Sequence, residues 1–457
     1  MDTKKLRQKI LDLAIHGKLV PQDPNDEPAS VLLERIKVEK EQLIKEGKIK
    51  RSRKSAKTSD TPHYGNVPFE VPDNWVWTDI EHICSKIGSG STPRGSNYSS
   101  KGIPFFRSQN IYNGGLVYED IKFISEEVHQ TMIGTEVLPN DLLLNITGGS
   151  LGRCAIVPEN FQRGNVSQHV CIMRPIFVVS EYFHAFVLSS IFSKSMKITG
   201  SGREGLPKYN LERMFFPLPP LSEQHRIVSE IENWFALIDQ IEQGKLDLQK
   251  VIKKAKNKIL DLAIHGKLVP QDPNDEPASE LLKRINPKAE ITCDNGHSKK
   301  LPQNWSISTV GNVLQLKSGE NIKVRQLPMG GKYPIYGGNG INGFYNKCNV
   351  SESTIIIGRV GFYCGSVFLT ESKAWVTDNA LIVSGYEGIY NTIYLAYLLQ
   401  YLNLGKVSNS TAQPVISRKG INPIQILIPP LSEQQRIVTK IEKLFSVLDN
   451  IQNALEA

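Results

Sequence analysis

The sequence has few cysteines and no long apolar run. Its six cysteines include no CxxC pair, a pattern typical of free thiols in a reducing compartment. Cys293 and His297 have a spacing that suits a metal, but two further ligands are missing, so we expect no zinc site. No apolar stretch approaches the ~18–20 residues that span a bilayer, and the N-terminal residues lack a signal-peptide pattern. We therefore expect a cytoplasmic protein.

Signatures of catalysis are also missing. The sequence contains no GxxxxGK[ST] phosphate-binding loop, so ATP hydrolysis on this chain is not expected. It has no Asn-Pro-Pro-aromatic motif of the kind that amino-methyltransferases use around the target amine. The one nuclease-like fragment, Glu371-Ser372-Lys373, has no aspartate in the preceding thirty residues to complete a metal site. We predict that this chain is not an enzyme.

What the sequence does have is repetition. Residues 9–30, "KILDLAIHGKLVPQDPNDEPAS", recur without a change at residues 258–279. A second pair of similar segments, residues 219–241 and 429–451, starts with "PPLSEQ" in both copies. Repeats of this length mark a structural unit that is used more than once.

The long segments between the repeats are diverged copies of one domain. Matching residues lie 230 positions apart in the pairs Trp75/Trp305, Pro104/Pro334 and Ile111/Ile341, and 210 apart in Gly148/Gly358, Cys154/Cys364, Val166/Val376 and Pro219/Pro429. We explain this change by a single insertion of about twenty residues between Ile111 and Gly148.

These matches predict five parts. They are a helical region with a basic linker at 1–62, a variable domain at 63–218, a central helical region at 219–298, a second variable domain at 299–428 and a last helix at 429–457. The central region resembles the C-terminal segment followed directly by the N-terminal segment. The order of the parts would therefore repeat if the two ends of the chain were joined, and we call this a near-circular repeat.

The central region has the pattern of a long helix. Apolar or small residues follow steps of four and three, with one polar break at Lys245: Ile227, Ile231, Trp234, Ile238, Ile241, Leu248, Ile252, Ala255, Ile259 and Leu262. Such a heptad seam favours lengthwise packing on another helix. The terminal segments carry the same seam, so we expect them to pack antiparallel to the helix at 222–264. At ~1.5 Å per residue the seam is ~54 Å long and could space two domains along DNA.

The helix ends have recognisable signals. Ser222 and Ser432 are predicted N-caps, and Gln435 would complete a capping box in the second copy. Gly17 and Gly266 are placed for a left-handed stop. His16 and His265 fit the last helical turn better than a catalytic role.

The variable domains mix short apolar stretches with Gly, Asn and Ser clusters, which predicts small strands, exposed loops and few helices. Polar side chains accompany aromatics at matched places, such as 105–111 and 335–341. Arg, Gln and Asn can pair with base edges, and Lys and Arg bind phosphates. The candidate DNA-contacting residues are Arg94, Arg107, Gln109, Asn110, Arg153, Gln168, Arg203 and Lys208 in the first domain, and Lys323, Arg325, Tyr336, Asn339, Arg359, Asn379, Gln413 and Arg418 in the second.

The net charge of +8 permits a polyanionic partner without requiring one. Seven lysines and arginines with a single acid occupy residues 45–57. This segment is interpreted either as a solvated linker or as an arm that contacts phosphates.

The whole chain resembles the specificity subunit of type I restriction–modification enzymes. The most specific matches are the two "PPLSEQ" helix starts, the "ILDLAIHGKLVPQ" blocks, and "VPDNW" and "LPQNW" where the variable domains begin. The resemblance implies an α+β fold, with two globular α/β target-recognition domains separated by a long antiparallel coiled coil in a pseudo-two-fold, circular repeat. This chain begins with the repeat block instead of a recognition domain, which shifts the circular start point.

The resemblance also implies a function. Each target-recognition domain would recognise one half of a split site in double-stranded DNA, and the conserved helices would set the spacing. Expected partners are two methyltransferase subunits that use S-adenosylmethionine and, through them, two motor-nuclease subunits that use ATP and Mg. No cofactor is expected on this chain.

Two alternatives stay open. One is a specificity subunit of a stand-alone or fused-type methylation system, which shares the fold and differs in its partners. The other is a coiled-coil adaptor that carries two protein-binding domains and does not bind DNA.

Overall fold

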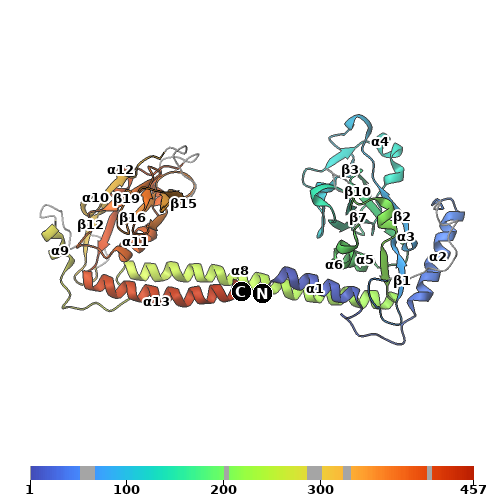
Figure 1. The fold of residues 1–457 in the computed structure, drawn as a ribbon, viewed down its shortest axis with the longest axis horizontal. Helices are drawn as coiled ribbons and strands as arrows, with labels where there is room; N and C mark the ends of the chain where they lie inside the picture. Colours follow the sequence, from blue (N-terminus) through green and yellow to red (C-terminus); the bar gives the residue numbers. More distant parts are fainter. Residues whose placement is uncertain are drawn as a thin grey trace. The chain divides into compact units, whose positions relative to one another are not determined.

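The computed structural model describes residues 2–51, 67–199, 205–285, 301–322, 331–408 and 414–456. The chain divides into two compact units, residues 1–244 (unit 1) and 245–457 (unit 2), and the division falls inside the long helix α8 (Figure 1). No helix in the described ranges combines the length and the apolar character that a membrane span requires.

Unit 1 contains two N-terminal helices, a mixed α/β domain and the first part of α8. Its elements are α1 (Thr3–Ile15), α2 (Ala29–Lys45), β1 (Val76–Asp79), α3 (Ile80–Ile83), β2 (Cys84–Ser89), β3 (Ile103–Phe106), β4 (Ile111–Tyr112), β5 (Gly115–Leu116), β6 (Lys122–Ile124), α4 (Glu126–Thr131), β7 (Leu142–Asn145), β8 (Cys154–Ile156), β9 (Asn165–Val166), β10 (Val170–Pro175), α5 (Ser180–Leu188), α6 (Ser190–Ser195), α7 (Lys208–Glu212), β11 (Phe215–Leu218) and α8 (Leu221–Ile264). Short 3₁₀ turns lie at Arg94–Ser96, Ser108–Asn110, Ile133–Thr135 and Gly148–Ser150.

Unit 2 contains the end of α8, a second mixed domain and the C-terminal helix. Its further elements are α9 (Ala278–Ile285), β12 (Ser306–Thr309), α10 (Val310–Val313), β13 (Gln315–Ser318), β14 (Tyr333–Gly337), β15 (Gly340–Tyr345), β16 (Ile355–Gly358), β17 (Val367–Leu369), β18 (Trp375–Val376), β19 (Ala380–Ser384), α11 (Thr392–Tyr401), the 3₁₀ turn η6 (Leu404–Val407), α12 (Arg418–Ile421), β20 (Gln425–Ile428) and α13 (Leu431–Glu456).

The sheets confirm that the two mixed domains are copies of one fold. The order β2-β10-β7-β8 in unit 1 corresponds to β13-β19-β16-β17 in unit 2. Strand β3 pairs antiparallel with β6 and parallel with β9, and β14 pairs in the same two ways with β15 and β18. The predicted α+β class and the predicted duplication are therefore correct.

The buried strands connect two apolar clusters in each unit. Leu142 and Leu144 of β7 pack in the cluster that includes α5 and α8, whereas Leu143 packs with Phe106 and Val166 on the other face. In β16, Ile355, Ile356 and Ile357 divide between two clusters in the same way. Successive side chains of a strand point to opposite faces, so a continuous apolar run is expected where both faces are covered.

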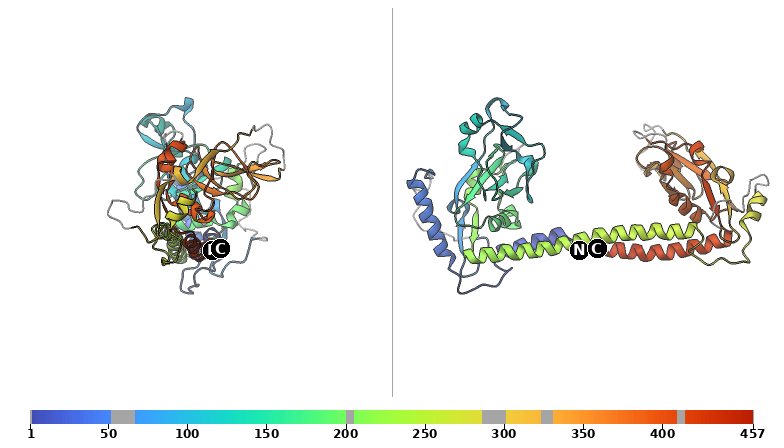
Figure 2. Two further views of the ribbon diagram at one scale, coloured as in Figure 1. Left: turned by 90° about the vertical axis from the view of Figure 1, so that its left-hand side faces the viewer. Right: turned by 180° about the vertical axis from the view of Figure 1, so that it is seen from behind.

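Each terminal helix packs antiparallel against the part of α8 in its own unit. In unit 1, Arg7 of α1 lies 2.5 Å from Asp239, while the segment after α1 reaches back to the first turn of α8 (Figures 1 and 2). In unit 2, Lys256 of α8 forms an ion pair with Asp449 of α13. The ends also agree with the sequence: Gly17 and Gly266 have φ of 66° and 64°, as a left-handed helix stop requires.

The predicted seam of α8 is correct only in part. Four seam residues are buried: Ile227, Ile231, Ile238 and Ile252. Near the end of α8 the buried residues are Leu260, Ala263 and Ile264, which are not seam positions. That end of α8 packs against both α13 and the mixed domain of unit 2, so a wider face is covered there. Three other seam residues are more than a third exposed: Trp234, Ile241 and Leu248.

The predicted N-caps are wrong. The helices begin at Leu221 and Leu431, one residue before the serines. Ser222 Oγ donates to Asp26 at 2.6 Å, and Ser432 Oγ donates to Asp275 at 2.7 Å. The hydroxyl groups therefore bind the repeated "PQDPNDEPAS" segment instead of free backbone N–H groups of the helix.

Candidate nucleic-acid interface

Four loops of unit 1 meet at one end of its sheets. Three of these loops follow β2, β3 and β7, and the fourth connects β9 to β10. Ser91 N donates to Val166 O at 3.1 Å, Asn145 Nδ2 donates to Ser108 O at 2.8 Å, and Ile146 N donates to His169 O at 3.0 Å. These bonds fix the loops relative to one another, and we call this region the loop end of unit 1.

Most of the candidate residues described in unit 1 lie on or beside this end. Four are exposed, namely Arg94, Gln109, Gln168 and Lys208, and two are half-buried, namely Arg107 and Arg153. The Arg153 guanidinium lies 4.8 Å from the centre of the Tyr112 ring, an arrangement that presents a cation and an aromatic side chain together. Arg107 donates to Asp120 O at 2.9 Å. Arg203 lies outside the described residues.

Asn110 does not belong with the exposed candidates. Its side chain is fully buried, accepts a bond from Arg107 N at 3.1 Å and donates to Val117 O and Glu119 O at 3.0 and 3.1 Å. All three bonds would break if the amide turned toward a base. In this structure Asn110 therefore stabilises the loop that carries Gln109.

Sequence reasoning did not select four residues at the loop end of unit 1, namely Tyr112, Asn113, Thr147 and His169. Thr147 and His169 form a hydrogen bond between Oγ1 and Nδ1 at 2.8 Å, and Asn113 Oδ1 accepts from Cys154 N at 3.1 Å. Their signal was present in the sequence, since His169 follows Gln168 in the same polar cluster. Tyr112 follows the 105–111 cluster directly.

Unit 2 has a corresponding loop end. Gly319 N donates to Ala380 O at 3.1 Å, Arg359 N to Asn379 O at 2.9 Å, and Ile416 N to Arg359 O at 2.9 Å. These bonds join the loops after β13 and β16 to the β18–β19 connection and to the segment before α12. They match, one for one, bonds at Gly90, Ile146 and Leu206 in unit 1.

The candidate residues of unit 2 divide in a similar way. Asn339, Asn379 and Arg418 are exposed, and Arg359 is half-buried with Nη1 at 3.2 Å from Ser318 Oγ. Tyr336 is 6% exposed, packs in an apolar cluster and accepts a bond from Glu371 N, so it is a core residue in this structure. The other candidates, Lys323, Arg325 and Gln413, lie outside the described residues.

In the loops after β7 and β16, the backbone hydrogen bonds match different residues of the two units from those that the sequence comparison paired. Asn145 N donates to Arg153 O and Gly152 N to Asn145 O, while Gly358 N donates to Ser366 O and Gly365 N to Gly358 O. Asn145 is thus equivalent to Gly358. The separation is 213 positions here and 210 again at Val166 and Val376. The predicted pairs Gly148/Gly358 and Cys154/Cys364 are therefore wrong. The separation changes in two steps, from 230 to 213 and then to 210, so unit 1 has two insertions instead of one.

Each mixed domain is fixed to its helix by the same buried contact. Trp75 Nε1 donates to Glu223 Oε2 at 2.9 Å, and Trp305 Nε1 donates to Glu433 Oε2 at 2.9 Å. Burial raises the pKa of both carboxyl groups, and the indole hydrogen bonds oppose that rise. These contacts orient the loop ends relative to the first turns of α8 and α13.

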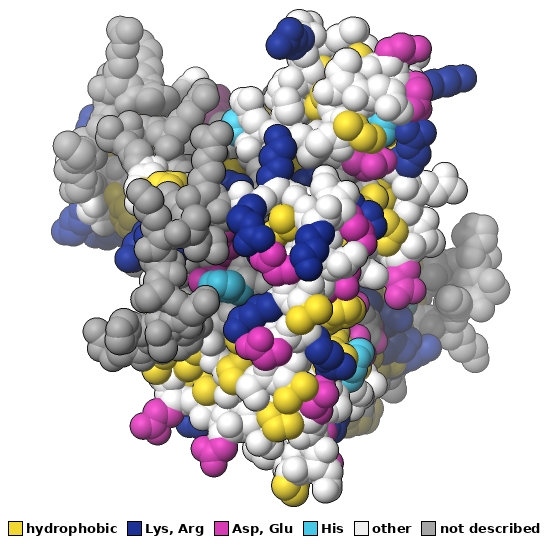
Figure 3. All heavy atoms as spheres, turned by 90° about the vertical axis from the view of Figure 1, so that its right-hand side faces the viewer, with side chains coloured by type: hydrophobic (Ala, Val, Ile, Leu, Met, Phe, Trp, Pro, Cys, Tyr) yellow, Lys and Arg dark blue, Asp and Glu magenta, His cyan; other side chains and the backbone are white. Residues whose placement is uncertain are grey.

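The cations of residues 45–51 are partly neutralised. Arg51 pairs with Glu41 at 2.5 Å, and Lys48 pairs with Glu46 at 2.7 Å. On the face of unit 1 that Figure 3 shows, Lys and Arg side chains alternate with Asp and Glu. The rest of the basic segment, residues 52–57, and the pair Cys293 and His297 lie outside the described residues.

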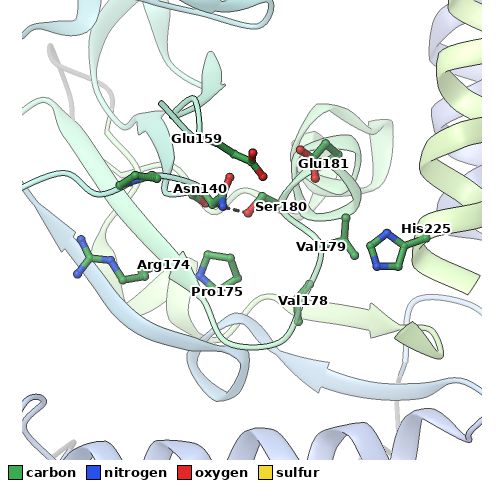
Figure 4. Close-up of a pocket in the computed structure, with 10 residues that line it drawn as sticks. Asn140, Glu159, Arg174, Pro175, Val178, Val179, Ser180, Glu181 and His225 are labelled. Atoms are coloured by element: carbon green, nitrogen blue, oxygen red, sulfur yellow. Dashed lines mark hydrogen bonds between the residues drawn. The ribbon is translucent and has the colours of Figure 1, made fainter. Parts of the chain in front are cut away.

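Unit 1 also contains a cavity of about 330 Å³ near Pro175, at the opposite end of β10 from the loop end. Ser180 Oγ donates to Asn140 O at 2.8 Å on its wall (Figure 4). The Arg174 guanidinium binds both oxygens of Asp141, at 2.7 and 2.8 Å. The cavity lies away from the loop end, so it is not our candidate site. Within the described ranges, no cluster of His, Cys, Asp and Glu could bind a metal ion.

The comparisons with known proteins agree with this architecture. Residues 72–250 and 302–457 each match the family described as "Type I restriction modification DNA specificity domain". The chain belongs to this family. The two matched segments contain the two loop ends.

Several specificity subunits are similar to this chain over most of its length. The Type I restriction enzyme EcoAI specificity subunit of Escherichia coli is 28% identical, over 98% of this chain and 90% of that protein. The EcoKI specificity subunit of Escherichia coli strain K12 is 23% identical, over 84% of both chains.

Solved structures share the fold. One, from a study of complex assembly and conformational transition of the type I R-M system, has a TM-score of 0.57 at 17% identity and covers 85% of this chain and 94% of its own. The HsdS subunit from Thermoanaerobacter tengcongensis has a TM-score of 0.51 at 17% identity and covers 85% of this chain and 92% of its own.

Proposed function

We propose that this chain is the specificity subunit of a type I restriction–modification system, in which each unit recognises one half of a split DNA site. The family membership and the two loop ends support this proposal. At each loop end, exposed amide and guanidinium groups lie on loops whose backbones are fixed by hydrogen bonds. Such groups can pair with base edges in the major groove.

One observation carries the proposal: the two units share the same contacts between mixed domain and helix but have different side chains at equivalent positions of their loop ends. The Trp–Glu contact and the Asp–Ser–Arg cluster at the helix start are the same in both units. At equivalent loop positions, however, Ile146 corresponds to Arg359 and His169 to Asn379. This difference is expected when two domains recognise different base sequences from a common scaffold.

The helices are proposed to set the distance between the half-sites and to bind partner subunits. The two identical "PQDPNDEPAS" segments each contact the first turn of a helix, through Asp26 in unit 1 and Asp275 in unit 2. Because the two segments offer two equivalent surfaces, we expect each chain to bind two methyltransferase subunits. We expect S-adenosylmethionine, ATP and Mg to bind partner subunits, motor-nuclease subunits among them, and this chain to have no catalytic role.

The test is DNA selection with the full chain assembled with its methyltransferase partner. Bound duplexes from a random pool are expected to share two short half-sites separated by a gap of fixed length. Retention of duplexes without sequence preference would contradict the proposal and favour a protein-binding adaptor. Native mass spectrometry is expected to find two methyltransferase subunits per chain, and a single copy at saturation would contradict that stoichiometry.

A further inference from the structure

Phe362 is the most exposed large apolar side chain among the described residues, at 91%. It lies in the loop of residues 359–366, which follows β16 at the loop end of unit 2. The neighbouring Tyr363 is 47% exposed, and the two rings meet edge to face with centroids 5.2 Å apart. Two adjacent exposed aromatics form an apolar projection, which is unfavourable in water unless a partner covers it.

The loop that carries Phe362 is held by its own backbone. Gly361 N donates to Pro414 O at 3.0 Å, Cys364 N to Gly361 O at 3.0 Å, and Gly365 N to Gly358 O at 2.8 Å. Gly361 and Gly365 have φ of 86° and 90°, where a side chain would be strained. A Cβ on Gly365 would also lie 2.2 Å from Gly405 N. The aromatic pair is therefore presented in a fixed position.

The backbone of this loop does not require aromatic residues. The equivalent loop of unit 1 repeats two of these bonds: Leu151 N donates to Gly148 O as Cys364 N does to Gly361 O, and Gly152 N donates to Asn145 O as Gly365 N does to Gly358 O. Its glycines at 148 and 152 also have positive φ. In that loop, Gly149 and Ser150 take the places of Phe362 and Tyr363. One unit thus carries an aromatic projection where the other carries none, although their folds are the same.

The surroundings indicate DNA as the partner of the projection. The loop is bonded to Asn379 through Arg359 N and bridges to Val415 through Val360. Lys406 and Lys419 are exposed on η6 and α12, which contact each other, and Gly405 of η6 lies next to Gly365 of the loop. Cations at this end can bind phosphates, which would bring the ring against the bases between them.

We propose that Phe362 inserts into the duplex at one base step of the half-site recognised by unit 2, and that unit 1 leaves its half-site stacked. Apolar side chains that enter between base pairs unstack and kink the duplex. The cost of unstacking is lowest at TA and CA/TG steps, so this half-site should contain such a step at the insertion point. The inference rests on the proposed function and adds an asymmetry between the half-sites.

The test uses the full chain with its methyltransferase partner and a duplex that contains the selected site. The adenine analogue 2-aminopurine, which fluoresces when it is unstacked, is placed at successive positions of both half-sites. The methyltransferase subunits turn the base that they methylate out of the stack, so a signal at that base in each half-site is expected with every variant. Wild type is expected to raise the fluorescence at one further position, in the half-site of unit 2. The double variant Phe362→Gly with Tyr363→Ser, which installs the dipeptide of unit 1, should abolish that signal and weaken binding by about 10- to 100-fold.

Two further variants control for folding. Phe362→Trp keeps an aromatic ring and should retain the fluorescence signal. The reciprocal variant, Gly149→Phe with Ser150→Tyr, is feasible because a Cβ on Gly149 meets no described atom within 4 Å. It should create a second signal, in the half-site of unit 1. Retained recognition of the other half-site shows in each case that the assembly is folded.

The outcomes separate this inference from the proposed function. Selective binding by wild type with no fluorescence change beyond the methylated base of each half-site, or an unchanged further signal in the glycine–serine variant, would overturn the insertion of Phe362 alone. Binding without any sequence preference by wild type would overturn the proposed function and this inference with it.

Discussion

Trp75 donates its indole N–H to the buried carboxylate of Glu223 at 2.9 Å, across 148 positions of the chain, and Trp305 repeats the contact with Glu433. Each contact joins the first residues of a mixed domain to the first turn of a helix. A strand begins directly after each tryptophan and leads into the domain. Each indole therefore helps to orient a loop end on its helix, together with the apolar cluster around it.

Replacing Trp75 with Phe should destabilise unit 1 by about 1–3 kcal/mol, because the carboxylate of Glu223 loses a buried donor. Hydrogen exchange followed by mass spectrometry should show faster exchange in peptides of unit 1 and no change in unit 2. The matched control is Trp77→Phe, since Trp77 Nε1 has no hydrogen-bond partner among the described residues. Equal effects of the two substitutions would contradict the assigned role of the Trp75 bond.

The buried glutamates predict a pH dependence. Burial raises the pKa of Glu223 and Glu433 above the usual 4.5. The folded state then binds more protons than the unfolded chain, so stability decreases as the pH rises from 4.5 through the raised values. Between about pH 5 and about pH 7 these two carboxyl groups should therefore lower the urea midpoint as the pH rises, and the double variant Glu223→Gln with Glu433→Gln should lack that contribution. An identical pH dependence in the double variant would contradict this assignment.

Gln109 and Asn110 are adjacent and should behave differently. Gln109→Ala should relax discrimination in the half-site of unit 1 by ~1–3 kcal/mol, the value of a lost two-pronged base contact, and leave the other half-site unchanged. Asn110→Ala removes three buried hydrogen bonds and should lower the stability of unit 1 instead. Binding to single-base variants of the selected site and thermal unfolding separate the two effects. Asn339→Ala is the counterpart of Gln109→Ala in unit 2.

The sequence predicted the helical frame well because the frame is repeated. Gly17 and Gly266 end identical segments, and their stop signals are local. Ser222 was assigned wrongly because the helix begins one residue earlier, at Leu221, and the hydroxyl donates to Asp26, which lies 196 positions away in the sequence. A local sequence pattern does not show a hydrogen-bond partner that lies so far away along the chain.

The loop ends were predicted less well. The match of Cys154 with Cys364 is misleading, since Cys154 is buried in β8 while Cys364 lies in the loop before β17. Asn110 was selected for its chemistry, but its neighbours Val117 and Glu119 provide backbone acceptors that keep it inside. Phe362 was not selected as a candidate, because an exposed phenylalanine has the same sequence signal as a buried one.

The central claim is that two separate recognition units are spaced by their helices. Inserting one heptad after Leu248 lengthens α8 by ~10 Å, about three base pairs of DNA, between the parts of α8 that contact α1 and α13. Methylation mapping of the wild-type and extended assemblies tests the claim most directly. The account predicts that both half-sites stay the same and that the gap between them grows. An unchanged gap, or half-sites that change with the insertion, would contradict it.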